Sequence, residues 1–205
     1  MENRMKPVAR FAGVAAALLF AAALVAFGAA LDGYSHALHP VALLGASGFP
    51  HALAFNLLGF VLPGVLAAVV AMALRAALPA DSGWPSRIGV QLIFISALAF
   101  IAMGLLPLDP TDLESQASSL HGTAWMLWCV AFVPGALLLA AGCWRTPAWA
   151  LFASLTALAA VALPAVAFLL AGALPAAVAQ RVAFGLWFGW LMLAGYTQAG
   201  SARAV

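Results

Sequence analysis

Long apolar runs alternate with short polar stretches along the whole chain. A membrane-crossing helix needs about 20 mostly apolar residues, and six segments meet this requirement. The predicted transmembrane helices cover roughly Arg10–Leu31, His51–Leu78, Ile88–Leu108, Gly122–Ala141, Ala148–Ala171 and Arg181–Ala199. Three of them carry interior prolines, which we expect to kink the helices: Pro63, Pro134 and Pro164. The pattern predicts an all-α, polytopic membrane protein with a single six-helix domain over residues 1–205.

Composition supports the same class of protein. The 205 residues are 66% hydrophobic and only 7% charged, whereas a soluble domain has about 25% charged residues. The net charge is only +2 and no basic patch occurs, so nucleic acid is not expected as a partner. The first apolar run, after MENRMKPVAR, is longer than the apolar core of a usual signal peptide. We therefore expect that run to be a transmembrane helix.

Basic residues gather on one side of the predicted bundle. With six helices, that side holds every lysine and arginine except Arg181, namely Arg4, Lys6, Arg10, Arg75, Arg87, Arg145 and Arg203. Basic residues mark the cytoplasmic side, so we expect both termini to be cytoplasmic in a multi-pass protein of the inner membrane. The extracytoplasmic side then collects Asp32, His36, His39, His51, Asp109, Asp112, Glu114 and His121.

Imidazoles and carboxylates at one mouth of the bundle could form a metal site. His36 and His39 are three residues apart, and His51 and His121 begin two predicted helices. Neutral imidazole and carboxylate are ligands for zinc or a similar divalent ion. A metal with an open position would activate water, with Asp32 or Asp109 as a ligand or as the general base.

A purely structural interpretation accounts for the same residues. Asp32 and Asp109 would cap helix ends or order loops, and the histidines would be polar residues at the membrane interface. The spacing lacks HExxH or any comparable metal motif. The sequence leaves both interpretations open.

Two further polar residues are candidates for substrate binding. Asn56 lies inside the second predicted helix, and a buried amide in lipid needs a partner. That partner is either a neighbouring helix or a substrate below the mouth. Arg181 either snorkels to a lipid headgroup, pairs with Asp109 or Asp112, or clamps an anionic substrate.

Two short segments have their own interpretations. Gly185 and Gly189 form a GxxxG pair in the last helix, a usual close-packing face that also suits a homo-oligomer contact. The segment Val41–Gly48, VALLGASG, is apolar but too short to span. It either lies at the interface, dips into the mouth as a re-entrant lid, or forms an extended surface loop.

The run DGYSHALHPVALLGASGFPHALAFNLLGFVLPG, with AMGLLPLDP and SSLHG further on, resembles an uncharacterised family of prokaryotic six-helix membrane proteins, a domain of unknown function numbered 998. This resemblance implies the fold and the membrane location and brings no activity. The plan also distantly resembles membrane hydrolases with histidine and aspartate zinc sites, such as the alkaline ceramidase superfamily. Those proteins have seven helices and a late His-x-x-x-His pair, whereas this chain has no histidine after His121.

Two classes of function follow from these patterns. In the first, the protein is not an enzyme and binds a membrane lipid or small solute for transport, lipid binding or assembly. In the second, it is a metal-dependent, membrane-embedded hydrolase of a lipid-like substrate. A bis-histidine haem carrier is a weaker third idea, because the histidines gather at one rim instead of facing each other inside helices.

Overall fold

The computed structural model describes residues 2–79, 81–169 and 173–200, and these residues form helices and loops without a strand. Six helical segments in this part of the chain are long and apolar enough to cross a membrane, which confirms the predicted all-α, six-span architecture. In chain order the elements are α1 (Glu2–Ala30), η1 (Val41–Gly45), α2 (Ala52–Phe55), η2 (Asn56–Val61), α3 (Leu62–Ala77), α4 (Trp84–Leu105), α5 (Gln116–Cys143), η3 (Pro147–Trp149), α6 (Ala150–Pro164), η4 (Ala165–Leu169) and α7 (Ala176–Gly200).

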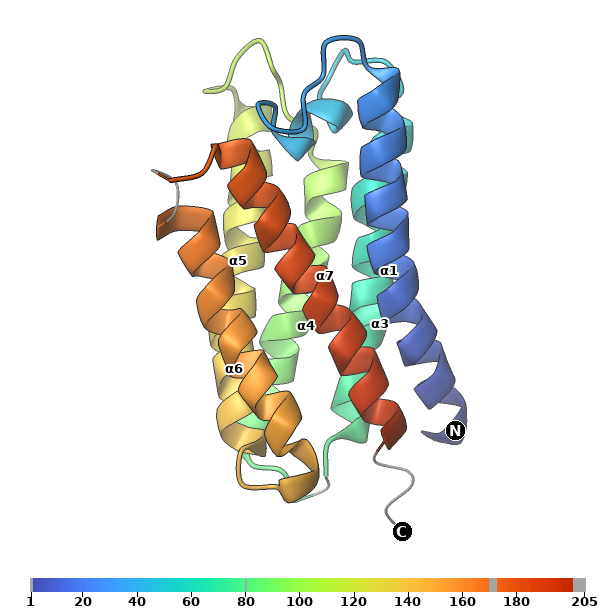
Figure 1. Cartoon of the computed structure of the whole chain (residues 1–205), viewed down its shortest axis with the longest axis vertical. Helices are drawn as coiled ribbons and strands as arrows, with labels where there is room; N and C mark the ends of the chain where they lie inside the picture. Colours follow the sequence, from blue (N-terminus) through green and yellow to red (C-terminus); the bar gives the residue numbers. More distant parts are fainter. Residues whose placement is uncertain (1, 80, 170–172, 201–205) are drawn as a thin grey trace.

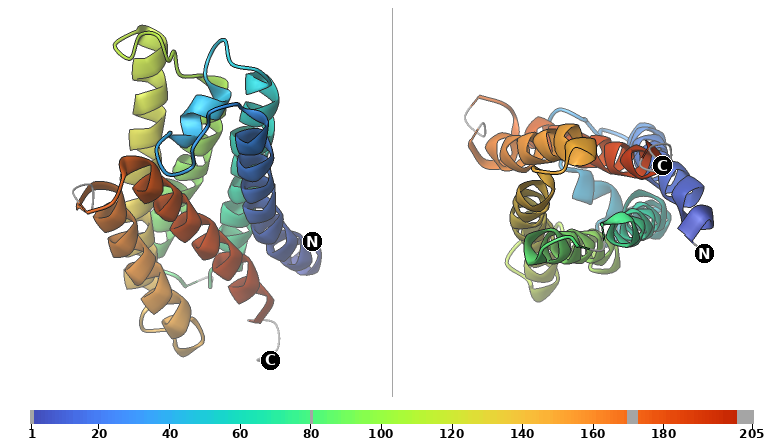
Figure 2. Two further views of the ribbon diagram at one scale, coloured as in Figure 1. Left: turned by 45° about the horizontal axis from the view of Figure 1, so that its top comes forward. Right: turned by 90° about the horizontal axis from the view of Figure 1, so that it is seen from below.

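The spans follow one another around a ring (Figure 1; Figure 2, right). α3 packs between α1 and α4, α5 packs between α4 and α6, and α7 closes the ring by packing on both α6 and α1. α1 begins and α7 ends at the same end of the bundle, which we call the base. The opposite end carries the connections over residues 31–51 and 106–115, and we call it the mouth. The cytoplasmic orientation of the base is a prediction from the charge pattern.

Two helices begin before their predicted apolar runs because groups outside those runs bind the N–H groups of their first turns. α5 begins before the predicted Gly122, since the Ser115 side chain accepts a hydrogen bond of 3.2 Å from the backbone N–H of Ser118. α7 begins before the predicted Arg181, directly after Pro175, whose carbonyl accepts two backbone N–H groups of the first turn. Hydropathy alone therefore underestimates the length of both helices at their N-terminal ends.

Two of the three interior prolines lie beside wide, π-helical turns. The π-helical turn η2 precedes Pro63, which lies in the first turn of α3, and η4 follows Pro164 at the end of α6. Proline has no backbone N–H and cannot donate a hydrogen bond within the helix. A nearby turn with the wider i→i+5 hydrogen-bond pattern of a π-helix accommodates this missing donor. Pro134 lies within α5, which is assigned as one continuous α-helix.

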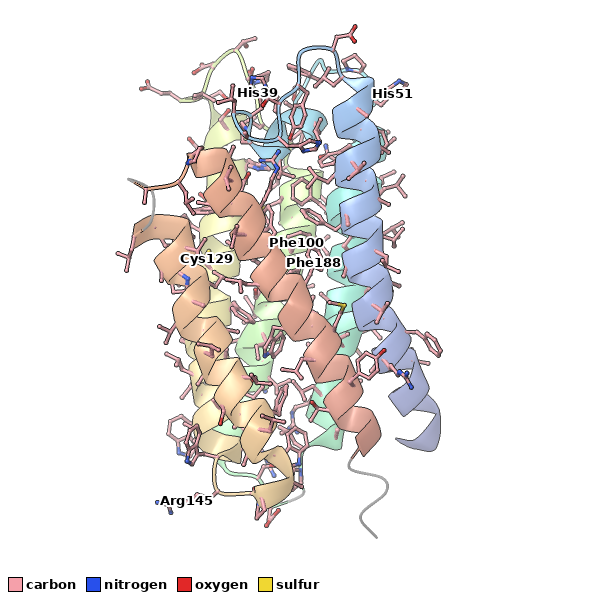
Figure 3. All side chains as sticks on the ribbon, in the orientation of Figure 1. His39, His51, Phe100, Cys129, Arg145 and Phe188 are labelled. Atoms are coloured by element: carbon pink, nitrogen blue, oxygen red, sulfur yellow. The ribbon has the colours of Figure 1, made fainter. Side chains whose placement is uncertain are left out.

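Aromatic side chains fill the middle of the ring. The Phe100 and Trp187 rings stack with centroids 4.6 Å apart, and the Phe20 and Phe188 centroids are 4.7 Å apart. Figure 3 places Phe100 and Phe188 near the middle of the bundle. The same cluster receives rings from η2 and α5, so every span except the fifth contributes to it: Phe60, Trp128 and Phe184 complete the set. This packing gives the bundle a dense core.

The close packing of α4 on α5 depends on glycine. A Cβ atom on Gly89 of α4 would lie 2.6 Å from the carbonyl oxygen of Gly135 on α5. Only glycine lets the two backbones approach this closely. Large apolar side chains such as Phe11 and Leu151 are instead exposed on the outside of the ring, as expected for a surface that faces lipid.

Candidate functional site

The mouth is covered by a short buried turn. Residues 41–46, which we call the plug, contain the 3-10 helix η1, and five of the six are buried, including Val41, Leu44 and Ala46. The light-blue turn at the upper end of Figure 1 is this element, and it is visible within the ring from below in Figure 2. The structure thus favours the lid among the three interpretations of this segment.

Two amides from the helices hold the plug. The Asn56 side chain is only 6% exposed and its Nδ2 donates a hydrogen bond of 2.9 Å to the carbonyl of Gly45. The Gln180 side-chain oxygen accepts a hydrogen bond of 2.9 Å from the backbone nitrogen of Val41. The buried amide of Asn56 therefore has a backbone partner in the plug, and substrate binding by Asn56 stays a prediction.

Arg181 ties the loop before the plug to α7. Its guanidinium donates to the backbone oxygen of His39 at 3.0 Å, to the Tyr34 hydroxyl at 2.5 Å and to the carbonyl of Ala177 at 2.7 Å. Burial raises the pKa of Tyr34, and the positive charge of Arg181 and its hydrogen bond partly offset that rise. The phenol stays protonated at neutral pH and donates in turn to the carbonyl of Pro40, at 3.3 Å. These contacts direct Arg181 toward the loop; substrate binding by this residue stays a prediction.

Two of the three histidines of the first connection share a neighbour, since the ring centroid of Tyr34 is 5.2 Å from that of His36 and 5.6 Å from that of His39. His39 Nδ1 accepts a hydrogen bond of 3.0 Å from the backbone nitrogen of Ser35. The exposed His36 packs edge-on against Tyr34, with ring centroids 5.2 Å apart. His51 is exposed in a left-handed backbone conformation (φ 60°), with its ring centroid 6.5 Å from that of Phe27. Figure 3 shows His39 and His51 at the same end of the bundle.

His121 lies apart from these three, inside the bundle. It is 8% exposed, its Nδ1 lies 2.9 Å from the carbonyl oxygen of Leu106, and its ring centroid is 6.4 Å from that of Phe60. In the described part of the chain, no three His, Cys, Asp or Glu side chains group closely enough to hold a metal ion. The predicted zinc site formed by His36, His39, His51 and His121 therefore gains no support from this geometry, and metal binding stays a prediction.

The two candidate catalytic carboxylates lie in exposed turns. Asp32 is exposed directly after α1. Asp109 accepts hydrogen bonds from the Thr111 hydroxyl at 2.7 Å and the Thr111 backbone nitrogen at 2.9 Å. These bonds, led by the hydroxyl, hold the pKa of Asp109 below its usual value. A carboxylate with a lowered pKa is a weak base near neutrality, which argues for a role of Asp109 in ordering the turn.

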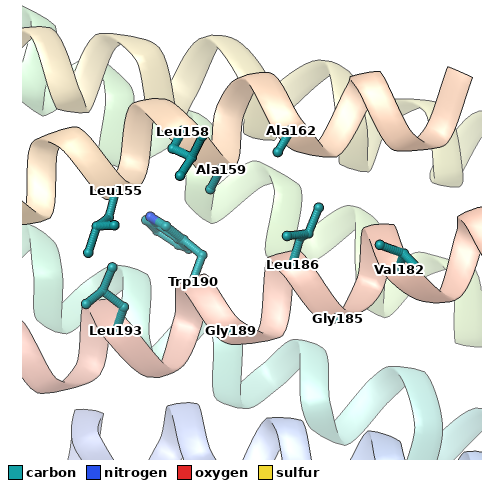
Figure 4. Close-up of a pocket in the computed structure, with 10 residues that line it drawn as sticks. All are labelled: Leu155, Leu158, Ala159, Ala162, Val182, Gly185, Leu186, Gly189, Trp190 and Leu193. Atoms are coloured by element: carbon teal, nitrogen blue, oxygen red, sulfur yellow. The ribbon is translucent and has the colours of Figure 1, made fainter. Parts of the chain in front are cut away.

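An apolar groove lies on the side of the bundle, at a position that the sequence did not indicate. It lies between α6 and α7, has a volume of about 580 Å³, and includes Gly185, Gly189 and Trp190 in its lining. Figure 4 shows α6 side chains facing α7 side chains across it: Leu155, Leu158 and Ala159 lie opposite Leu186, Trp190 and Leu193. The GxxxG pair was the sequence feature that pointed to this face of α7. The sequence could not show that α6 leaves these two glycines uncovered.

Comparison with known proteins identifies a family without an assigned activity. The family described as "Protein of unknown function (DUF998)" matches residues 14–197, which is most of the chain. Searches of curated proteins and of solved structures gave no significant match, so the likeness to alkaline ceramidases gains no support. The family match and the six apolar helices agree with the resemblance seen in the first connection. The chain is therefore a membrane protein that belongs to the DUF998 family.

Proposed function

We propose that this protein binds a hydrocarbon chain of a membrane lipid in the groove between α6 and α7. The observation that carries the proposal is the open space over Gly185 and Gly189. A Cβ atom on either glycine would have no neighbour within 4 Å, whereas Gly89 and Gly135 are covered by the neighbouring helix. The surface over the two α7 glycines is therefore not covered by other parts of the protein and is open to a ligand.

The chemistry of the groove suits a hydrocarbon ligand. Its α7 residues follow a helical stripe from Val182 to Leu193, and its α6 residues are leucines and alanines. The one polar atom of the lining side chains is the indole nitrogen of Trp190, and it donates a hydrogen bond of 3.0 Å to the Thr156 hydroxyl. Because this bond occupies the indole N–H and joins α7 to α6, no lining side chain has a free hydrogen-bonding group, and the groove offers a largely apolar surface to a ligand.

The length of the groove suits one leaflet of the bilayer. From Val182 to Leu193 the helix rises about 17 Å, at about 1.5 Å per residue. This is about half of the ~30 Å hydrocarbon core of a bilayer. One acyl chain lying along α7 would therefore fill the groove from end to end.

Two leucine substitutions, Gly185→Leu and Gly189→Leu, test the proposal because a Cβ atom at either position has no neighbour within 4 Å and the longer side chain would extend into the groove. Gly122→Leu is the matched control, since Gly122 is an exposed helical glycine outside the groove and a Cβ atom added to it would have nothing within 4 Å. The probe is a phospholipid with a photoreactive diazirine on one acyl chain, and the crosslinked residues are mapped by peptide mass spectrometry.

We expect the wild-type protein and Gly122→Leu to crosslink mainly at residues 155–162 and 182–193, and the two groove variants to lose most of that crosslinking. Even labelling of all six spans, or unchanged labelling in the groove variants, would contradict the proposal. Gly185 and Gly189 were also predicted as an oligomer contact. If the groove variants instead dissociate an oligomer and leave the crosslinking unchanged, the groove is a protein interface and the lipid proposal fails.

A further inference from the structure

We propose a second lipid site, independent of the first, in which the groove between α3 and α4 binds an anionic phospholipid of the leaflet on the base side. This groove has a volume of about 630 Å³. Most of its lining is apolar, including Met72, Val90, Phe94 and Ile95, but it also contains Arg75 and Gln91. The combination of one cation, one amide and an apolar surface matches the phosphate, the ester groups and the acyl chain of a phospholipid.

Arg75 provides the positive charge for the phosphate. It lies in the last turn of α3, is exposed, and makes no hydrogen bond or ion pair with another described residue. By contrast, the guanidinium of Arg10 at the same end lies 4.5 Å from the centre of the Tyr196 ring. A guanidinium binds phosphate oxygens with two parallel hydrogen bonds. Arg75 is therefore an available cation at the rim of an apolar groove.

Gln91 provides the hydrogen-bonding group one level deeper. It lies on α4 about 10 Å along the helix from Trp84, at about 1.5 Å per residue. Trp84 is 69% exposed at the start of the helix and marks the interface, since tryptophan concentrates there. The Gln91 side chain is exposed within a membrane span and has no hydrogen-bond partner among the described residues.

An amide that faces hydrocarbon needs a hydrogen-bond partner, and a lipid ester carbonyl would be one for Gln91. α3 ends at the base and α4 begins there, so Arg75 in the last turn of α3 lies nearer the membrane surface than Gln91. A phospholipid has its groups in the same order, with phosphate outermost, ester groups beneath it and hydrocarbon innermost. The net negative charge of an anionic lipid complements the single cation of the groove.

This groove and the one between α6 and α7 lie on different parts of the ring (Figure 2, right). They share no lining residue. A failed test of one site therefore leaves the other untouched.

The test uses the full-length protein exchanged into an equal mixture of phosphatidylglycerol and phosphatidylcholine, with retained lipids counted by native mass spectrometry. We expect wild type to retain phosphatidylglycerol preferentially and Arg75→Gln to lose that preference, with roughly tenfold weaker retention, equivalent to about 1.4 kcal/mol. Gln91→Leu should reduce retention of both lipids, because its ester contact is common to both.

Arg145→Gln is the matched control, because Arg145 is also exposed at the base but lies outside the groove (Figure 3). Its lipid retention should equal that of wild type. An unchanged phosphatidylglycerol preference in Arg75→Gln would overturn the proposal. An equal loss in Arg145→Gln would overturn it too, because the preference would then reflect general attraction to the basic end. Thermal unfolding of each variant verifies that the fold is intact.

Discussion

The first two connections at the mouth, residues 31–51 and 106–115, contain the same kinds of polar residue and use them differently. In residues 31–51 the backbone is held by side chains from distant helices: Asn56 on η2, and Gln180 and Arg181 on α7. In residues 106–115 side chains of the connection bond within it, as Asp109 does with Thr111. The helix contacts of its backbone oxygens come from Ser118 and His121 on α5, the helix that directly follows. One backbone hydrogen bond of 2.8 Å, from Ser47 to Leu108, joins the two connections.

Burial explains the difference between the connections. The plug takes backbone N–H and C=O groups away from water, and buried backbone groups require partners. The helices around the plug supply those partners. The second connection is largely exposed around Thr111–Glu114, so its backbone groups there are open to water, and side chains close in sequence satisfy the others. A polar residue at the mouth therefore acts as a cross-bundle anchor or as a local cap, depending on how deep its connection lies.

The largest expected loss of stability comes from Gly45→Ala, which adds a methyl group where the plug contacts the Asn56 side chain. A Cβ atom on Gly45 would lie far inside contact distance of the Asn56 amide. The Asn56 side chain cannot move away from that atom without losing its hydrogen bond to the carbonyl of Gly45. We expect a loss of about 2–3 kcal/mol in the free energy of unfolding, measured by thermal unfolding in detergent. Gly122→Ala, at an open position, should cost almost nothing. If the clash is the cause, adding Asn56→Ala to Gly45→Ala should recover part of the lost free energy of unfolding. If the losses of the two single variants simply add in the double variant, the clash is not the cause.

A smaller effect is expected from Arg181→Gln, which removes the link between α7 and the first connection. The variant loses the hydrogen bonds to Tyr34 and His39, worth about 1–2 kcal/mol together. Hydrogen exchange should become faster over residues 34–46 and stay unchanged over residues 106–115. Arg145→Gln serves as the control for loss of charge. Equal acceleration in both connections would show that the mouth opens as one unit and would remove the contrast between them.

The smallest effect is local to the second connection. Removing the hydroxyl with Thr111→Val should move the pKa of Asp109 up toward the ordinary value of about 3.9. Because the pKa is lowered in the folded protein, the stabilising contribution of this carboxylate is present above the unfolded value and is lost as the pH falls through the folded value. Carbon-13 NMR titration of the carboxyl group measures the change. Thr123→Val, whose hydroxyl bonds within α5, should leave the titration of Asp109 unchanged.

The sequence predicted the individual helices correctly, but it did not predict how side chains on one element are placed relative to another element. The amide of Asn56 was expected to be buried with a partner, and it is, but the partner is the carbonyl of Gly45 in a segment whose position the sequence left open. Gly185 and Gly189 were expected to form a close-packing face, yet their outer side borders the groove between α6 and α7. Gln91 carries no motif, and only the arrangement of α3 beside α4 places it with Arg75.

The sequence by itself determined the six spans, the absence of strands in the described chain and the end of the bundle at which residues such as Arg75, Arg145 and Asp109 lie. These features are local, because a helix in lipid satisfies its own backbone within one segment. The tertiary structure alone decided that the plug is buried, that His121 lies inside the bundle while His36 and His51 are exposed, and that grooves open between particular helices. Those outcomes depend on the rotation and spacing of neighbouring helices, and such relations are set by packing between segments that lie far apart in the chain.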